Sequence, residues 1–447
     1  MKHFLNFAVL GAAGALLLGA CTAKEQQPEA KAAPEAVSFD AYLNRGVATK
    51  AGTAGELDLT ALQAQGFGVF GYYTNDVLYS QAFLPNFMYN EQVTHNGSNW
   101  TYAIPKYWPN EYGANAESEN VDRVSFFAYA PWVDVEPSTG LVTDDQTVGI
   151  TKVTRATDSG DPKVSYLASF TPAQCVDLCW GVAKADFTTA LGTSEGTNNI
   201  KKDDPFLNVA KLPANEKIAY SFKHALSALN VQVDAVIDEQ DDPDWANVKT
   251  RIYVRSITFQ GFATEGQLNL NSSYNTPLWK NYDGNGTVST APVTVYDGRR
   301  DGREATSAAA TELPAGLNPV IIQKDGLATQ DGVTATAVNL FDNTTATTPV
   351  YVVPNDDALR VTIVYDVETQ DPDVLSTYLA DGTTHGSVIE NVITQVVKDG
   401  TGAEIIMEAG KKYTLKLHLG MVSAQFSATV SDWGTGSDAE ADLPANS

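Results

Sequence analysis

Short segments that alternate apolar and polar residues recur along most of the chain, and they restrict its fold more than any other feature. The clearest examples lie in the second half, at Leu359–Val367, Tyr413–Leu419 and Ala424–Val430. Successive side chains of a β-strand point to opposite faces, so this alternation is typical of strands that bury one face. Gly, Asn, Asp and Pro separate the segments, and long helical periodicity is absent. The sequence therefore predicts an all-β fold, built from β-sandwiches with few short helices.

The length of the chain indicates more than one folding unit. A chain of 447 residues exceeds what one ordinary hydrophobic core holds. A stretch rich in Gly, Asn, Asp and Lys at 191–213 is a candidate inter-domain region. We therefore expect an N-terminal sandwich over 46–215 and a C-terminal sandwich over 216–434, followed by an acidic tail at 435–447.

The first residues are typical of a secreted bacterial lipoprotein. Residues 1–21 combine Lys2 with an apolar run and end in Leu18-Gly19-Ala20-Cys21, which resembles a lipobox. Cys21 is then the lipidation site, and residues 22–36 form a flexible Glu/Gln/Ala/Pro-rich tether. The alternative is a plain signal peptide with a chance cysteine. The lipidated form would be anchored in the outer membrane and exposed at the cell surface.

Residues 37–45 form the first segment after the tether with a strand pattern. Val37, Phe39, Ala41 and Leu43 alternate with polar residues and would share one face. The segment ends at Arg45 and is followed by a small-residue linker, 46–55, of a kind that proteases enter easily. Arg45 and Lys50 are both sites for a trypsin-like protease. We therefore predict that 37–45 is a removable first strand.

Local signals also predict one hairpin and one short helix. Asn96-Gly97 between two strand-like runs is a strong hairpin turn. Thr171 suits the N-cap of a helix and Pro172 its first position. A short helix is therefore expected after Thr171, with Cys175 and Cys179 on one face. Cysteines four apart on a helix are too distant for an unstrained disulfide. Two buried free thiols are therefore the preferred interpretation.

The sequence contains no recognisable reactive or metal-binding motif. His95, His224, His385 and His418 show no metal-ligand spacing, and His224 is interpreted as a core or rim histidine. The acidic turns at 238–244 and 283–286 lack the rest of a calcium loop. A net charge of −25 opposes nucleic acid as a partner. We predict no enzymatic activity, no cofactor and no metal.

Aromatic residues gather between Phe67 and Trp108. Tyr107, Trp108 and Tyr112 lie in a Pro-flanked loop and could stack on sugar rings. The same loop could instead close one end of a sandwich, which is the preferred interpretation because the surrounding stretch alternates as strand.

Taken in order, several segments resemble the fimbrillin family, the structural subunits of type V pili. These segments are Gly66–Tyr73, Asn96–Tyr102, Lys106–Pro109, Val124–Pro131, Phe222–Ser227 and Tyr413–Val430 ending at Asp432-Trp433. No single segment is diagnostic, and the order and spacing carry the resemblance.

The resemblance implies two tandem transthyretin-like β-sandwich domains and a lipoprotein precursor. It also implies assembly by strand exchange, in which a trypsin-like protease cuts after an arginine, the first strand leaves, and a C-terminal segment of the next subunit fills the groove. In this sequence 37–44 matches the released strand and Arg45 the cut site, although Lys50 offers a second site. The partners implied are other pilus subunits, the processing protease, the outer membrane and a host or microbial surface ligand. The alternative hypothesis is a monomeric surface lipoprotein that binds glycans and does not polymerise.

Overall fold

The structure is a computed structural model of the 447-residue chain. It describes residues 35–43, 56–75, 77–109, 122–144, 147–192, 196–213, 215–235, 250–274, 278–280, 291–297, 321–322, 328–330, 333–335, 338–341, 349–379, 384–420 and 424–433. Cys21, Arg45, Lys50, Tyr112 and the acidic turns at 238–244 and 283–286 lie outside these ranges.

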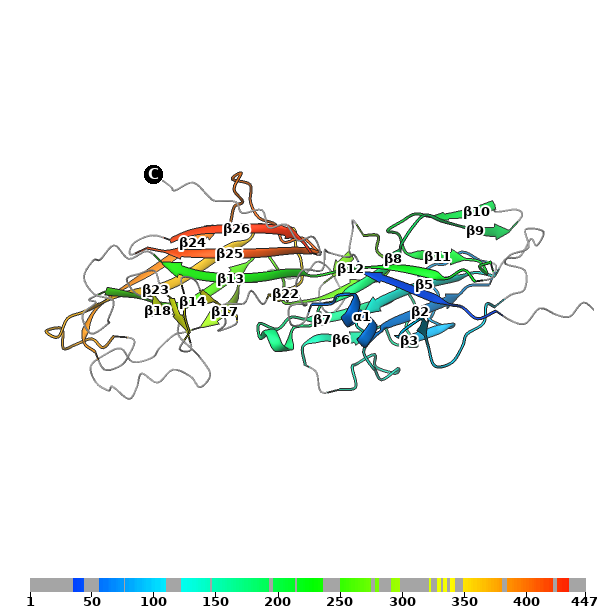
Figure 1. Ribbon diagram of the computed structural model, residues 1–447, viewed down its shortest axis with the longest axis horizontal. Helices are drawn as coiled ribbons and strands as arrows, with labels where there is room; N and C mark the ends of the chain where they lie inside the picture. Colours follow the sequence, from blue (N-terminus) through cyan, green and yellow to red (C-terminus); the bar gives the residue numbers. More distant parts are fainter. Residues whose placement is uncertain are drawn as a thin grey trace, which may run out of the picture.

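Figure 1 shows two lobes along the long axis, one built mainly from the first half of the chain and one from the second. The main sheet of the first lobe runs in the order β1-β12-β8-β5-β2-β3-β4, and β11 also pairs with β5. Its strands are β1 (Phe39–Leu43), β2 (Phe67–Tyr73), β3 (Met88–His95), β4 (Trp100–Thr101), β5 (Val124–Ala130), β8 (Cys179–Ala183), β11 (Phe206–Val209) and β12 (Ile218–His224). A separate hairpin joins β9 (Phe187–Gly192) and β10 (Gly196–Ile200).

The second lobe contains two larger sheets. One runs β21-β13-β25-β26, with β22 also on β13, and the other runs β20-β19-β18-β14-β23-β24, with β17 also on β14. The first comprises β13 (Ser227–Ala235), β21 (Val338–Asn339), β22 (Val350–Val352), β25 (Lys411–Leu419) and β26 (Ala424–Asp432). The second comprises β14 (Thr250–Gln260), β17 (Val293–Asp297), β18 (Ile321–Ile322), β19 (Ala328–Gln330), β20 (Val333–Ala335), β23 (Arg360–Gln370) and β24 (Gly386–Val396).

A further sheet connects the two halves of the chain. β6 (Gly149–Val153) and β7 (Lys163–Leu167) continue into β15 (Glu265–Asn269) and β16 (Leu278–Lys280). One hydrophobic cluster accordingly contains Trp180 of the first half and Tyr413 of the second. Three strands that follow residue 215, β12, β15 and β16, therefore belong to sheets that also contain strands of the first half. The division into domains at 46–215 and 216–434 stays a prediction.

The prediction of an all-β fold is confirmed at the level of secondary structure. β23 buries Val361, Ile363 and Tyr365, and β25 buries alternate residues from Tyr413 to Leu419. The hairpin at Asn96-Gly97 is confirmed, because Thr94 and His95 pair with Thr101 and Trp100. Whether the lobes are transthyretin-like domains stays a prediction.

Helical structure differs from the expectation in two places. The short helix expected after Thr171 is only a three-residue 3-10 turn, Pro172–Gln174. Thr171 makes no side-chain cap hydrogen bond, and Cys175 is already extended, so the chain straightens towards β8. Conversely, α1 (Leu59–Gln65) was not expected from the sequence. It begins after Asp58, whose carboxylate accepts a hydrogen bond from the Ala61 amide, and it buries Leu62.

Among the described residues, no helix has both the length and the apolar character needed to cross a bilayer.

Candidate functional site

The first strand lies at the edge of the sheet that the first half of the chain builds. Among the strands that the structure describes, β1 pairs only with β12, in parallel, from Phe39 opposite Ile218 to Leu43 opposite Phe222. In Figure 1 it is the dark blue arrow that runs beside β12. Parallel strands cannot be joined by a tight turn, so this pairing brings together segments about 180 positions apart. Local sequence patterns carry no signal for such a partner.

The apolar face of this strand is buried, as the alternation predicted. Val37 and Phe39 are each 1% exposed, and Ala41 and Leu43 are each 5% exposed. Burial of a large apolar side chain stabilises a fold by about 1.5–3 kcal/mol. The four residues predicted to form the face of a removable strand therefore lie together against the core, while removal of the strand stays a prediction.

The ring of Phe39 occupies a slot formed by four other aromatic rings. Its centroid lies 5.7 Å from that of Tyr102, 5.9 Å from Phe126, 6.2 Å from Tyr220 and 6.4 Å from Phe67. We call these four residues the Phe39 slot. Edge-to-face and offset pairs of this kind add to the stabilisation that burial alone gives.

A glycine beneath Tyr220 makes room for this slot. A Cβ atom at Gly181 of β8 would lie 2.7 Å from Cδ1 of Tyr220. A larger residue at this position would therefore collide with the Tyr220 ring.

The residues just before β1 are fastened to the aromatic loop at 102–108. The Val37 amide donates to the Lys106 carbonyl at 2.8 Å, and the Trp108 amide donates to the Glu35 carbonyl at 3.0 Å. The Tyr102 hydroxyl donates to the Val37 carbonyl at 2.7 Å. Trp108 is 8% exposed and packs on Phe126, so its indole belongs to the core, as preferred from the sequence. Of the loop residues considered for sugar stacking, only Tyr107 is exposed among those described.

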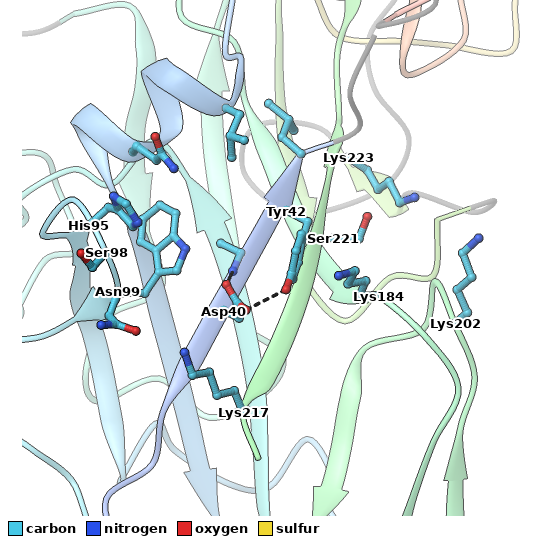
Figure 2. Close-up of a pocket in the computed structure, with 15 residues that line it drawn as sticks. Asp40, Tyr42, His95, Ser98, Asn99, Lys184, Lys202, Lys217, Ser221 and Lys223 are labelled. Atoms are coloured by element: carbon cyan, nitrogen blue, oxygen red, sulfur yellow. Dashed lines mark hydrogen bonds between the residues drawn. The ribbon is translucent and has the colours of Figure 1, made fainter. Parts of the chain in front are cut away.

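The outward face of β1 lines an open pocket of about 680 Å³. Figure 2 shows Asp40 and Tyr42 on this face, with Lys184 and Lys217 close by. The Lys184 ammonium lies 3.1 Å from the centre of the Tyr42 ring, and the Tyr42 hydroxyl donates to the Asp40 carboxylate at 2.7 Å. Tyr42 is 36% exposed, so these contacts contribute little compared with the buried face.

A group of three potential metal ligands, two of them buried and His224 half-buried, lies at the end of β12. His224 Nδ1 is 2.8 Å from Asp177 Oδ2 and 3.4 Å from Cys179 Sγ. Asp177 Oδ2 also accepts a hydrogen bond from the Leu57 amide. The three donor atoms lie within 4.8 Å of one another, and nitrogen, sulfur and oxygen are ligands that zinc accepts. The His224 imidazole and the Asp177 carboxylate are already hydrogen-bonded to each other. The arrangement is therefore explained by a structural hydrogen bond without a metal ion.

Both cysteines are free and buried, which confirms the preferred interpretation of them as thiols. Burial raises the pKa of Cys175 to about 11. Burial, with further contributions from Asp177 and Glu56, raises the pKa of Cys179 well above its ordinary value. The Cys179 sulfur is therefore a protonated thiol at neutral pH, and a weak metal ligand in that form.

A second group joins the residues after the linker to the last strand. The Glu56 carboxylate accepts from Lys412 Nζ at 2.9 and 3.0 Å and from Trp433 Nε1 at 3.1 Å. The Trp433 ring is stacked between His224 and Tyr351, with centroids 4.3 and 5.0 Å away. We call Glu56, Lys412 and Trp433 the Glu56 clasp. It fastens the segment that follows the 46–55 linker to the end of β26.

Sequence reasoning missed both groups because their members are far apart along the chain. Asp177 and His224 are separated by 47 positions, and Glu56 and Trp433 by 377. The interpretation of His224 as a core or rim histidine agrees with its half-buried, stacked position.

No protein-family model matches the chain. A 132-residue stretch is 29% identical to the fimbrium subunit Fim1C of Phocaeicola vulgatus. This stretch makes up 28% of the chain and spans 30% of the length of that relative.

The fold as a whole resembles a solved structure, a fimbrial protein from Bacteroides vulgatus. The superposition has a TM-score of 0.50 at 17% sequence identity, and it covers 89% of this chain and 99% of the other. At this identity the likeness concerns the fold. The chain thus resembles fimbrial proteins in two respects, a related stretch of sequence and the overall fold.

Proposed function

We propose that this protein is a structural subunit of a cell-surface fimbria that polymerises by exchange of its first strand. In this proposal the precursor is exported as an outer-membrane lipoprotein, lipidated at Cys21. A trypsin-like protease cuts at Arg45 or Lys50, β1 leaves, and a segment of another pilus subunit replaces it. The subunit would serve adhesion to a host or microbial surface and would not act as an enzyme.

The observation that carries the proposal is how β1 is held. It is an edge strand with a buried apolar face, and within the described part of the chain its main-chain ladder has a single partner, β12. Its loss would expose the Phe39 slot together with the unpaired edge of β12. An apolar trough beside an open sheet edge favours the addition of another strand.

Cleavage is a reasonable trigger for such an exchange. While β1 is covalently attached, it competes as an intramolecular strand at a high effective concentration, which a donor from another molecule cannot match. Cutting the linker removes this advantage. After the cut, β1 is a separate peptide, and how much of it rebinds depends on its concentration in solution.

The alternative, a monomeric glycan-binding lipoprotein, is less well supported. Its leading stacking residue, Trp108, is buried against Phe126. Tyr107 alone, among the described residues of that loop, has an exposed ring, and one ring is a small platform for a sugar.

Limited trypsin digestion of the purified precursor tests the proposal. The expected result is release of a peptide that ends at Arg45 or Lys50, followed by a ladder of polymers on gels. A variant with Arg45→Ala and Lys50→Ala should stay monomeric under the same digestion. Ladders of equal intensity from this variant would refute the processing step.

A further inference from the structure

β24 is a long strand at the edge of its sheet, and it lacks the usual protections of a sheet edge. Its ladder to β23 runs over all 11 residues from Gly386 to Val396 without a bulge, and no other described strand pairs with it. Its sequence contains neither lysine nor proline, which commonly protect exposed edges. The terminal strands β4, β16, β20 and β21 of the described sheets have only two or three residues each. β24 therefore offers a much longer edge to a partner strand than these do.

Two aliphatic side chains of β24 are exposed at this edge. Ile389 is 62% exposed and Val392 is 60% exposed. Ile389 lies opposite Val367 of β23, which is buried. Residues that lie opposite each other in an antiparallel ladder have their side chains on the same face of the sheet. Ile389 is therefore on the core face of the sheet although solvent reaches it, and a further strand beyond β24 would cover it.

The core-face residues of β24 read the same in both directions. Every second residue gives the order polar, isoleucine, asparagine, isoleucine, polar, at Ser387, Ile389, Asn391, Ile393 and Gln395. A two-fold axis places residues that are equally distant from the centre opposite one another, so a self-complementary strand needs such a palindrome. We propose that β24 pairs antiparallel with β24 of a second copy, centred on Asn391, with Ile389 of each copy opposite Ile393 of the other.

Charge also favours this register. The chain has a net charge of −25, so two copies repel each other over most of their surfaces. β24 contains a single charged residue, Glu390, whose carboxylate forms an ion pair with the Arg255 guanidinium. In the register centred on Asn391, Glu390 lies opposite Val392 of the second copy. A register centred on Glu390 would instead place two carboxylates directly opposite each other, which is destabilising. A register centred on Val392 would place Ile389 opposite a glutamine.

This contact is small and separate from the groove of β1. One pair of edge strands is a smaller contact than a standard stable interface, so single molecules should come apart at low concentration and on denaturing gels. Figure 1 shows β24 in the lobe built mainly from the second half of the chain, whereas β1 lies in the other lobe. The pairing therefore needs no cleavage of the linker. If the subunits form a fimbria as proposed, repetition along two neighbouring filaments would multiply the contact and hold the filaments side by side.

Sedimentation of the uncleaved chain over a range of concentrations tests the pairing without any contribution from strand exchange. We expect a dimer whose fraction rises with concentration. Ile389→Lys should weaken the dimer about 100-fold, because the two-fold axis makes each substitution count twice. Leu375→Lys is the matched control, since Leu375 is 67% exposed in the same half of the chain but lies in a turn. A chain that stays monomeric throughout, or a dimer that Ile389→Lys leaves unchanged, would overturn the inference.

Disulfide cross-linking of the uncleaved chain tests the register. In Asn391→Cys the introduced residue meets its own copy across the axis, at a Cα separation of about 4.5–5.5 Å that a disulfide can span. In Gln395→Cys the two introduced residues lie eight positions apart along the strands, about 27 Å. Under mild oxidation we expect a disulfide-linked dimer from Asn391→Cys, and from Gln395→Cys no more than from the parent chain, which controls for its own three cysteines. Equal cross-linking of both variants, or none from Asn391→Cys, would overturn the inference and leave strand exchange untouched.

Discussion

The carboxylate of Glu56 accepts a hydrogen bond from the indole of Trp433, 3.1 Å away and 377 positions later in the chain. Glu56 directly follows the 46–55 linker, which begins after Arg45 and contains Lys50, and Trp433 directly follows β26. The segment after the linker and the end of β26 are therefore fastened to each other. Any local opening of the end of β26 has to break this clasp.

Substitution of Glu56 is expected to loosen β26. Glu56→Ala removes the ion pair with Lys412 and the acceptor for the Trp433 indole, so the free energy of unfolding should fall by about 1–2 kcal/mol. Amide hydrogen exchange should accelerate within 424–432. Glu265→Ala, which removes an exposed carboxylate from β15, is the matched control. If both variants lose the same stability, the clasp has no special role.

The two faces of β1 should differ strongly in their contribution to stability. Phe39→Ala empties the Phe39 slot and is expected to cost about 3–5 kcal/mol in the precursor. Tyr42→Ala, on the exposed face of the same strand, should cost less than about 1 kcal/mol. Urea unfolding of both variants measures the difference. Similar losses would show that the slot does not hold the strand.

Stability is expected to decrease above about pH 8.5. Burial raises the pKa of Cys175 to about 11, and burial raises the pKa values of Tyr129 and Tyr220 above the ordinary range. The unfolded chain ionises near the ordinary pKa values, about 8.5 for cysteine and 10 for tyrosine. At higher pH the unfolded state therefore binds fewer protons than the folded state, and the free energy of unfolding falls.

Urea unfolding between pH 7 and pH 10.5 measures this decrease. Cys175→Ala should make the decrease shallower between about pH 8.5 and 10.5, because one of the contributing groups is gone. Stability that is constant or rises over the same interval would contradict the assigned burial of these groups.

The sequence predicts those features that depend on local pattern. The alternation in β1, β23, β25 and β26 identified their buried faces. Successive side chains of a strand point to opposite faces, whichever strand it pairs with. The Asn96-Gly97 hairpin followed from turn chemistry for the same reason. The helix expected after Thr171 is replaced by a single 3-10 turn. Thr171 makes no capping hydrogen bond, and the backbone is already extended at Cys175, where the chain continues towards β8.

Pairing across long separations was beyond such patterns. The parallel match of β1 with β12, the Asp177–His224 contact and the Glu56 clasp each join segments with no signal for one another. The buried face of the candidate site was therefore predictable, whereas its walls, its fastening to the 102–108 loop and its link to β26 required the structure.

A reversible lock on β1 tests the central claim most directly. Tyr42 and Ser221 are register partners on the same face, and adjacent strands are close enough for a disulfide. In a variant with Tyr42→Cys and Ser221→Cys, trypsin should cut the linker, and a disulfide between the two introduced cysteines should hold β1 on β12. We expect no polymers until a reductant is added, and polymers soon afterwards. Polymers that form equally well while the disulfide is intact would contradict the account.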